Sequence, residues 1–577
     1  MLKYTNDRGT QIVLALLKAH GIRKVVASPG TTNIALIASM QYDPWFEMYS
    51  SVDERSAAYI ACGLAAESGE PVVISCTGAT ASRNYFPALT EAYYRKLPIL
   101  VVTGSHGDEK IGHLYAQVID RSQAPKDTIR MSISVDRICS VDDEWAVMVN
   151  VNKAILELWH RGGGPVHINL RVGIACGFTT KKLPDVRVIK RYMPMDKLPS
   201  IPLGRVAVFV GSHKRFSINE TCLIERFCSQ HNGVVICDHT SGYIGKYKVL
   251  NALCACQQYA DDMLQPNLII HIGEVSADLY DTNSLRSKQV WRVNEDGEIR
   301  DLFGSLTAVF EMTESTFFKA YTTDNVENST KSEYYESLRA YYELIFSKIP
   351  GLPFCNIWIA QQLHHKLPQE SYLQLGIFNT LRSWNFFNIH ESIQTGCNVG
   401  GFGIDGPIST LLGGALANPD KIHYAIVGDL AFFYDLNCLG NRHIVPNIRV
   451  MVINNGCGAE FKNYDHPASQ WRDDADRYMA AGGHFGKKSH HLVKHYAENL
   501  GFEYFSASNK DEFLSIYKRF LVAETQPKPM VFEVFTTAED ESSAIKLVRT
   551  INNIDVASRI KSGISTLKNV ISDFLNS

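Results

Sequence analysis

The sequence lacks the features that mark membrane-spanning, secreted and nucleic-acid-binding chains. No apolar run reaches the roughly 18 residues that a transmembrane helix needs, and the first residues have no apolar core of the signal-peptide kind. The net charge is only −3 over 577 residues, so no strongly basic surface for nucleic acid or anionic lipid is expected. We therefore predict a cytoplasmic protein that binds neither nucleic acid nor membranes.

The sequence also lacks the usual signs of zinc sites and disulfide frameworks. It has 13 cysteines, an odd and scattered set without a Cys-x-x-Cys pair, and no His-Glu-x-x-His segment. Buried, reduced thiols fit this distribution better than disulfides or zinc ligands.

Short β-rich apolar runs alternate with helix-sized segments along most of the chain, and in the middle region we predict strands at 206–210, 233–237, 268–272 and 290–293. Such alternation is typical of α/β domains in which helices cover both faces of a parallel sheet. We predict three doubly wound parallel-sheet domains, at 1–180, 204–345 and 352–540. A C-terminal helical tail is expected over 541–577, because apolar residues recur there at spacings of three and four.

Two of the predicted strands, at 423–427 and 448–453, end in polar residues that suit a metal site. Asp429 follows the first strand, and Asn455 follows the second 26 residues later, with a crossover helix expected over 434–443 between them. Ligands bind at the carboxyl ends of parallel strands, and carboxylate and amide oxygens are ligands that Mg²⁺ prefers. Two ordinary strands ending in turn residues are the alternative.

The pair Gly428-Asp429 and Asn454-Asn455 resembles the diphosphate–metal motif of thiamine-diphosphate enzymes. The resemblance implies Mg²⁺ ligands at Asp429, at Asn455 and at the main-chain carbonyl of Cys457. It also implies contacts with the coenzyme at Gly428, Leu430 and Ala431. Many family members have Gly where this chain has Leu430, and a Leu there resembles the menaquinone-pathway branch.

The segment SSVDERSAAYIACGLA resembles the family's pyrimidine-binding segment and puts Glu54 at the position of its catalytic glutamate. In the family that carboxyl group hydrogen-bonds the aminopyrimidine ring of the coenzyme. A helix-start acid facing water is the alternative, and it suits Asp53 better than Glu54. The same resemblance places four more residues with Glu54 on the pyrimidine side of the coenzyme, namely Pro29, Thr77, Gly78 and Asn84.

Residues 400–406 contain a formal G-x-G-x-x-G pattern, which alone would suggest a dinucleotide site. No clear strand precedes it, and no ribose-binding acid follows at the right distance. The segment looks instead like the family's loop before the metal motif, and Ile404 matches the bulky residue that props the coenzyme in its bent shape.

The resemblance implies an enzyme that uses thiamine diphosphate and Mg²⁺ to decarboxylate a 2-oxoacid and to transfer the product to an acceptor. It also implies a homodimer or homotetramer, because the two halves of each site come from different subunits in this family. Gln117 and Arg382 match substrate positions of the menaquinone-pathway synthase, and Arg382 would hold a carboxylate. A surface arginine is the alternative for Arg382.

Several basic groups of that synthase are missing from this chain. Thr31-Thr32 stand in place of Ser-Arg, and His106 and Val399 stand in place of arginines. A Lys-Arg pair of the synthase corresponds to residues near 278–281, where this chain has two aspartates. We therefore expect a different substrate pair, with the orthodox synthase and an inactive coenzyme-binding subunit as alternatives. The new polar candidates for the substrate site are Thr31, Arg83, His106 and His113, each of which could also be a solvated loop residue. A flavin in the middle domain has no signature in the sequence.

Overall fold

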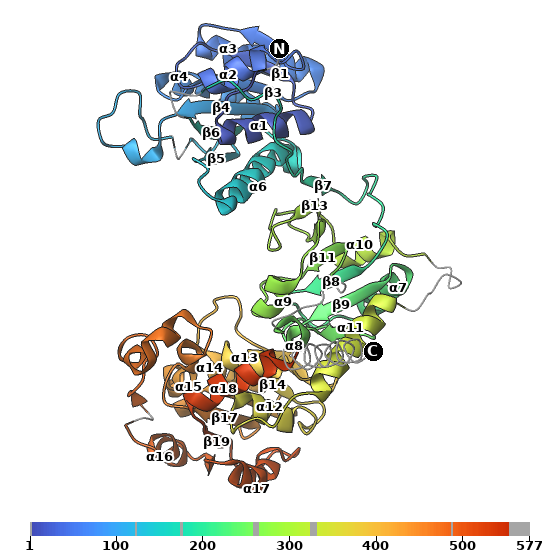
Figure 1. The fold of residues 1–577 in the computed structure, drawn as a ribbon, viewed down its shortest axis with the longest axis vertical. Helices are drawn as coiled ribbons and strands as arrows, with labels where there is room; N and C mark the ends of the chain where they lie inside the picture. The colour runs from blue at the N-terminus through green and yellow to red at the C-terminus, as the bar shows by residue number, and fades with distance from the viewer. Residues whose placement is uncertain are drawn as a thin grey trace, which may run out of the picture. The chain divides into compact units, whose positions relative to one another are not determined.

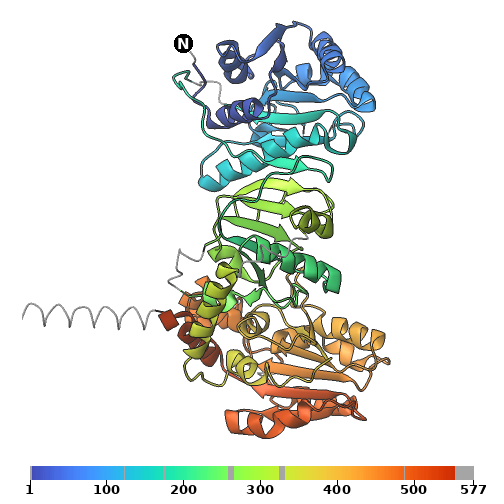
Figure 2. The same ribbon diagram turned by 90° about the vertical axis from the view of Figure 1, so that its right-hand side faces the viewer.

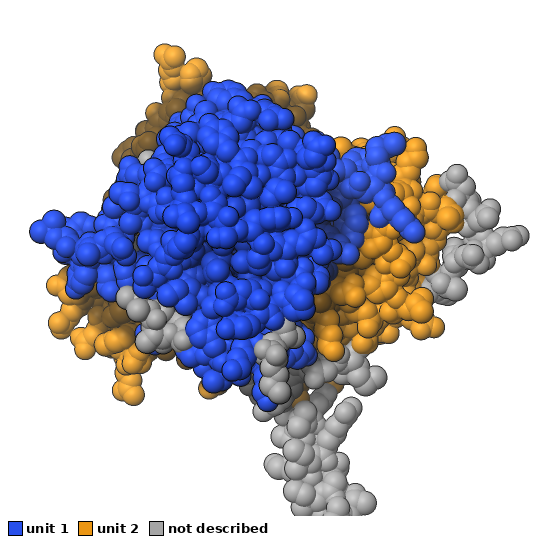
Figure 3. Space-filling view, turned by 90° about the horizontal axis from the view of Figure 1, so that it is seen from above, with its two compact units in different colours: residues 1–197, 295–311 blue, residues 198–294, 312–577 orange. Residues whose placement is uncertain are grey.

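The computed structural model describes residues 3–121, 124–172, 177–257, 265–323, 332–485 and 488–552. The chain forms two compact units, which Figure 3 colours separately. Unit 1 contains residues 1–197 and 295–311, and unit 2 contains residues 198–294 and 312–577. None of the helices in the described ranges has both the length and the apolar character needed to span a bilayer.

Unit 1 is built on a six-stranded sheet in the order β2-β1-β3-β4-β6-β5, with every pair of neighbours parallel (Figure 1). Strands β7 and β13 also pair in parallel. The strands are β1 (Lys24–Ala27), β2 (Glu47–Ser50), β3 (Val72–Thr77), β4 (Ile99–Ser105), β5 (Met131–Val135), β6 (Val166–Arg171), β7 (Lys190–Tyr192) and β13 (Leu306–Phe310). The helices are α1 (Arg8–Ala19), α2 (Ile34–Gln41), α3 (Glu54–Ser68), α4 (Thr80–Asn84), α5 (Phe86–Arg95) and α6 (Val141–Glu157).

Both faces of this sheet are covered, because successive residues of a strand point to opposite sides. Along β3, Val73 belongs to one buried apolar cluster, while Val72 and Ile74 belong to another. The second cluster includes the alanine-rich face of α3, which lets that helix pack closely on the strands. Helix α3 begins after Asp53, whose carboxylate accepts a hydrogen bond from the Arg55 N–H, as a helix N-cap does.

Unit 2 contains two further parallel sheets. The first runs in the order β10-β9-β8-β11-β12, and the second in the order β15-β14-β16-β17-β19-β18 (Figures 1 and 2). The strands of the first are β8 (Val206–Val210), β9 (Gly233–Cys237), β10 (Lys248–Leu250), β11 (Leu268–Ile272) and β12 (Val290–Val293). Those of the second are β14 (Tyr372–Leu375), β15 (Gln394–Gly396), β16 (His423–Gly428), β17 (Ile448–Asn454), β18 (Glu503–Ala507) and β19 (Met530–Phe535).

The helices of unit 2 begin with α7 (Ile218–Gln230), α8 (Ala252–Ala255), α9 (Leu279–Ser284), α10 (Glu314–Ala320), α11 (Glu333–Ser347) and α12 (Asn356–Leu363). They continue with α13 (Asn379–Trp384), α14 (Pro407–Ala417), α15 (Asp429–Tyr434), α16 (Leu492–Asn499), α17 (Lys510–Phe520) and α18 (Ala538–Arg549). Short 3-10 helices cover Leu436–Gly440, Ala459–Lys462 and Pro467–Arg477.

Strand β17 lies at the centre of the second sheet of unit 2 and shows why this sheet is doubly wound. Val450 and Val452 belong to a cluster with α14 and α15, whereas Met451 and Ile453 belong to a cluster with α12, α13 and α18. All seven residues of the strand are buried. A strand buried on both faces reads as a continuous apolar run, as parallel strands do.

Parallel sheets with helices on both faces confirm the predicted α/β fold class. The crossover between the two strands is helical, but the predicted bounds 434–443 are wrong: α15 starts directly at Asp429 and ends at Tyr434, and a 3-10 helix follows over Leu436–Gly440. Asp435 leaves the helical conformation, and its carboxylate accepts hydrogen bonds from the N–H and the hydroxyl of Ser409, both at 2.6 Å. Helix α18 extends into the first residues of the predicted helical tail, and the apolar stripe over 556–574 lies outside the described residues.

Candidate active site

The candidate metal site lies at the carboxyl ends of two neighbouring strands of unit 2. Asp429 follows β16 and is the first residue of α15, and Asn455 follows β17. The two strands pair in parallel up to Gly428 and Ile453, so both polar residues leave the sheet at the same edge. A left-handed turn at Gly456, with φ 74°, then redirects the chain, a conformation that favours glycine.

Asp429 is a buried carboxylate, only 3% exposed, and it forms no ion pair with any residue that the structure describes. Burial raises its pKa to about 7, although the backbone N–H groups of Leu430 and Gly456 act in the opposite direction. Burying an unpaired carboxylate is unfavourable unless a cation or several donors compensate it. A divalent cation bound here would supply the missing positive charge, so this residue fits a metal ligand.

The two asparagines have different surroundings. Asn454 is buried and donates to the Glu533 carboxylate at 2.7 Å, so its side chain belongs to the interior. Asn455 is half-buried, and its Oδ1 accepts two long bonds, from the N–H of Cys457 at 3.4 Å and from the Cys457 thiol at 3.8 Å. Its amide oxygen therefore has capacity for a further partner. Within the described ranges, no cluster of three or more His, Cys, Asp or Glu side chains could hold a metal, so the proposed ligand set depends on an amide and a carbonyl oxygen.

The other predicted positions of this half surround the same strand end. Gly428 and Leu430 are half-buried on either side of Asp429. Ala431, within α15, is buried in the apolar cluster on that side of the sheet. Ile404 is half-buried and packs against the same apolar cluster. The segment at 400–406 follows the short strand β15, which the sequence did not predict.

In unit 1, Glu54 and Asn84 come together at the start of α3. The Asn84 side-chain amide donates to Glu54 Oε2 at 3.3 Å, and the Glu54 side chain is half-buried. Asp53 is exposed and caps the helix, whereas Glu54 is half-buried. As expected from the sequence, Asp53 is therefore the more water-exposed of the two acids at the helix start.

Thr77 and Gly78, at the end of β3, form a close-packed edge. Thr77 is 7% exposed, and its hydroxyl has no hydrogen-bond partner among the described residues. A Cβ atom on Gly30 would lie 2.2 Å from that hydroxyl oxygen, and one on Gly78 would lie 2.6 Å from the carbonyl oxygen of Gly104. Both glycines are therefore needed for the chain to approach this edge, beside the exposed Pro29.

The predicted carboxylate clamp, Arg382, is already paired with an acid that sequence reasoning missed. Its Nη1 donates to Glu460 Oε1 at 2.5 Å, and the two side chains are 13% and 20% exposed. Glu460 also accepts from the Asn463 amide at 3.2 Å. The pair lines a cavity of about 560 Å³ that also contains Asp465 and Arg549, which form a second ion pair. No sequence motif pointed to Glu460, although it lies only five positions after Asn455.

Buried acids occupy the part of unit 2 that corresponds by resemblance to the Lys-Arg pair of the menaquinone-pathway synthase. Asp278 is 2% exposed, and one of its oxygens has no hydrogen-bond partner among the described residues. Burial raises its pKa to about 7, with a further contribution from Asp238. Asp281 is also buried and accepts from the Asn251 amide at 2.6 Å. This region therefore carries acids rather than cations.

The remaining substrate candidates lie on unit 1. Thr31 and His113 are exposed, and His106 is half-buried. Gln117 is exposed and has φ 61°, an uncommon backbone conformation for a residue with a side chain. Arg83 is exposed, and its guanidinium donates to the Asp120 carbonyl at 3.3 Å.

Arg121 is a second residue that sequence reasoning missed. Its Nη2 donates to Asn169 Oδ1 at 2.7 Å, and a Cβ on Gly78 would lie 1.4 Å from its Nη1. The guanidinium group therefore lies directly over Gly78, one of the predicted coenzyme positions. Arg121 lies four positions after Gln117 in the same loop, and this nearness to a predicted substrate residue was the only sign in the sequence that it could belong to the site.

Two family models match this chain. One, described as "Thiamine pyrophosphate enzyme, N-terminal TPP binding domain", matches residues 7–124. The other, described as "Thiamine pyrophosphate enzyme, C-terminal TPP binding domain", matches residues 380–534. The first contains Glu54, Thr77 and Asn84, and the second contains Asp429 and Asn455.

Full-length relatives are similar over nearly the whole chain. A 2-succinyl-5-enolpyruvyl-6-hydroxy-3-cyclohexene-1-carboxylate synthase of Bacteroides thetaiotaomicron is 31% identical over 558 residues, which is 94% of this chain and 98% of the relative. The protein of the same name from Phocaeicola vulgatus is 29% identical, with coverage of 94% and 98%. That of Flavobacterium johnsoniae is 27% identical, with coverage of 93% and 97%.

Proposed function

Since the chain belongs to the thiamine pyrophosphate enzyme family, we propose that it uses thiamine diphosphate and Mg²⁺ to decarboxylate a 2-oxoacid. We further propose that it transfers the resulting acyl-anion equivalent to an acceptor, as a carboligase. The observation that carries the proposal is the buried Asp429 carboxylate, which has no ion-pair partner among the described residues and stands beside Asn455 at the edge of the sheet.

In this proposal each half-site has a separate task. Asp429, Asn455 and the carbonyl oxygen of Cys457 hold Mg²⁺ and, through it, a diphosphate group. When bound, the coenzyme would supply the nucleophilic carbon that decarboxylation of a 2-oxoacid requires. Glu54 holds a proton at the ring nitrogen of the aminopyrimidine, and Asn84 orients the Glu54 carboxyl group through the hydrogen bond at 3.3 Å. Ile404 provides an apolar support for the coenzyme.

We also propose a homodimer or homotetramer that works in the cytoplasm. Support comes from α3, the helix that begins at Glu54. Its Tyr59 and Ile60 side chains are 48% and 44% exposed in the single chain. An apolar surface on the helix that carries a proposed catalytic residue fits burial against a second copy.

The synthase activity named for the relatives is the second candidate. Their similarity over more than nine-tenths of this chain favours it. The ion pair between Arg382 and Glu460 and the buried Asp278 favour a different substrate pair, because neither leaves a cation for a second carboxylate. Incubation with 2-oxoglutarate and isochorismate, followed by mass spectrometry, distinguishes the two. Formation of the named product would establish the second candidate.

The general proposal is tested by measuring coenzyme binding and CO₂ release separately. We expect thiamine diphosphate to bind only with Mg²⁺, and one or more 2-oxoacids of a panel to release CO₂. Glu54→Gln should still bind the coenzyme but lose CO₂ release, while Glu67→Gln, an exposed acid on the same helix, should behave as wild type. Unchanged CO₂ release in Glu54→Gln would contradict the assignment. Coenzyme binding without CO₂ release in the wild type would favour an inactive coenzyme-binding subunit.

A further inference from the structure

A second cavity of unit 2 is formed by residues that the proposed reaction does not use. Its volume is about 280 Å³, and apart from Tyr372 of β14 its lining residues come from three parts of the chain. These are the loop after β8 (213–215), the segment from the end of β9 to the start of β10 (238–248), and the segment that leads into β15 (389–395). The first two lie at the carboxyl ends of parallel strands, where α/β sheets bind ligands.

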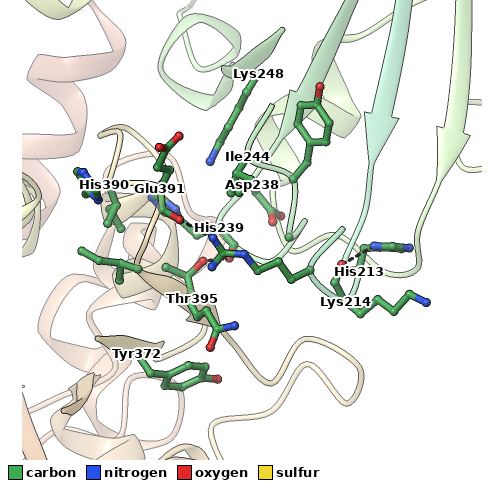
Figure 4. Close-up of a pocket in the computed structure, with 16 residues that line it drawn as sticks. His213, Lys214, Asp238, His239, Ile244, Lys248, Tyr372, His390, Glu391 and Thr395 are labelled. Carbon is green, nitrogen blue, oxygen red and sulfur yellow. Dashed lines mark hydrogen bonds between the residues drawn. The ribbon is translucent and has the colours of Figure 1, made fainter. Parts of the chain in front are cut away.

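The wall of this cavity carries an amino group without a partner. Lys248 forms no ion pair and no side-chain hydrogen bond with any residue in the described ranges. Burial lowers the pKa of its ammonium group. In Figure 4 its amino group is directed toward the loop that carries His390 and Glu391. A desolvated ammonium group lacks the compensation that a bound anion would provide.

Asp238, one of the two acids in the wall, is occupied by neutral donors. One oxygen of Asp238 accepts from the N–H and the hydroxyl of Thr240, both at 2.6 Å. The same oxygen accepts from the Ser241 hydroxyl at 3.3 Å, and the other accepts from the Ser276 hydroxyl at 3.0 Å. Asp238 is 4% exposed and is therefore fixed inside this network. Lys214 is directed away from the Lys248 amino group (Figure 4), so Lys248 and Arg215 are the cations that an anion in the cavity would meet.

Hydrogen bonds hold the walls together before any ligand binds. The Arg215 guanidinium donates to the Glu391 carbonyl at 2.8 Å, which ties the first segment to the third. His239 Nε2 lies 2.9 Å from the Trp384 carbonyl, and the Thr395 hydroxyl donates to the His239 carbonyl. Burial lowers the pKa of His239 to about 3, so its ring is neutral and donates one hydrogen bond to the carbonyl. A preformed cavity loses less free energy on binding than one that must be ordered.

We propose that this cavity is a binding site for a small anionic metabolite, with its phosphate or carboxylate group held by Lys248 and the guanidinium of Arg215. The cavity is near the lower end of the about 300–1,000 Å³ of small-molecule pockets, so the ligand is a single small unit and not a dinucleotide. The site connects the two sheets of unit 2, since its third wall leads into β15. The inference does not depend on the proposed reaction, because Asp429 and Asn455 take no part in the cavity.

The test measures anion binding to the full-length protein loaded with thiamine diphosphate and Mg²⁺, so that the proposed diphosphate site is filled. The probes are inorganic phosphate and malonate, titrated by calorimetry at constant ionic strength. We expect saturable one-site binding of at least one probe, and the stronger of the two identifies the preferred head group. Absence of saturable binding of both probes would overturn the proposal.

Three variants locate the binding. Lys248→Met should weaken it about 10- to 100-fold, as expected for the loss of one charge-assisted hydrogen bond, and Lys248→Arg should retain most of it. Lys214→Met is the matched control, because Lys214 has the same charge and lines the same cavity, but is exposed and directed away from the Lys248 amino group (Figure 4). Equal weakening in Lys214→Met and Lys248→Met would show diffuse charge attraction and overturn the site. Circular dichroism of each variant establishes that it is folded.

Discussion

Glu460→Gln is expected to let the proposed active site accept a second carboxylate. In the wild type, Glu460 Oε1 lies 2.5 Å from Arg382 Nη1, and both side chains are mostly buried. The guanidinium group is therefore occupied by the protein's own acid. Glutamine has nearly the same shape and keeps an oxygen for Asn463, but it removes the negative charge that now holds Arg382.

The size of the effect depends on the geometry of the pair. Opposite charges about 4 Å apart near a protein surface attract by about 4 kcal/mol at an effective dielectric constant near 20. A substrate carboxylate must compete with that attraction in the wild type. With the charge removed, Arg382 can give a substrate carboxylate a charge-assisted hydrogen bond worth about 1.5–3 kcal/mol. This corresponds to an increase of about 10- to 150-fold in kcat/KM.

The assay compares CO₂ release from 2-oxoglutarate and from 2-oxobutanoate, which lacks the second carboxylate. The ratio of their kcat/KM values should rise in Glu460→Gln and return to the wild-type value in the double variant Arg382→Gln/Glu460→Gln. Asp473→Asn is the control. Asp473 also forms an ion pair, with its Oδ1 3.7 Å from Lys462 Nζ, but its side chain is 99% exposed. An unchanged ratio in Glu460→Gln, or a gain that persists in the double variant, would refute the reasoning.

Three further outcomes are expected. Asp429→Asn should abolish Mg²⁺-dependent coenzyme binding. It should also raise the melting temperature of the coenzyme-free protein at pH 8 by a few degrees, because it removes a buried unpaired charge. Calorimetry with and without Mg²⁺ measures both effects. Glu54→Gln should lower kcat by about 10²- to 10⁴-fold, the usual size of a proton-transfer contribution, as followed by CO₂ release. Burial lowers the pKa of His167 to about 3, so the unfolded chain alone binds a proton below about pH 6.5, and stability falls from there toward pH 3 by up to about 5 kcal/mol. In His167→Gln the urea midpoint should depend less on pH over this range; an equal dependence would contradict the assignment.

The strands of the central region show how far the sequence alone predicts the fold. The runs at 206–210, 233–237, 268–272 and 290–293 were predicted as strands, and β8, β9, β11 and β12 have these same bounds. Each is nearly all apolar and lies between turn residues, because a parallel strand buried on both faces has few positions that suit polar side chains. Strand β5 (Met131–Val135) was missed because it lies at the edge of its sheet, where serines alternate with apolar residues.

The metal half of the candidate site was also within reach of the sequence, because both ligands directly follow strands. The sequence could not predict the bounds of the helix after the first strand, because the end of α15 depends on the hydrogen bond between Ser409 and Asp435, which are 26 positions apart. The pairing of Arg382 with Glu460 spans 78 positions. Contacts of this kind have no local signature in the sequence, and only the packed structure brings the two side chains together.

The solitary carboxylate at the end of β16 has a consequence for the life of the protein in the cell. Until a cation neutralises it, Asp429 lowers the free energy of unfolding of the very unit that must receive the coenzyme. Newly made chains short of thiamine or magnesium would open more often and offer more unfolded backbone to proteases. We therefore expect the abundance of the protein to follow the supply of its coenzyme, without any dedicated regulator.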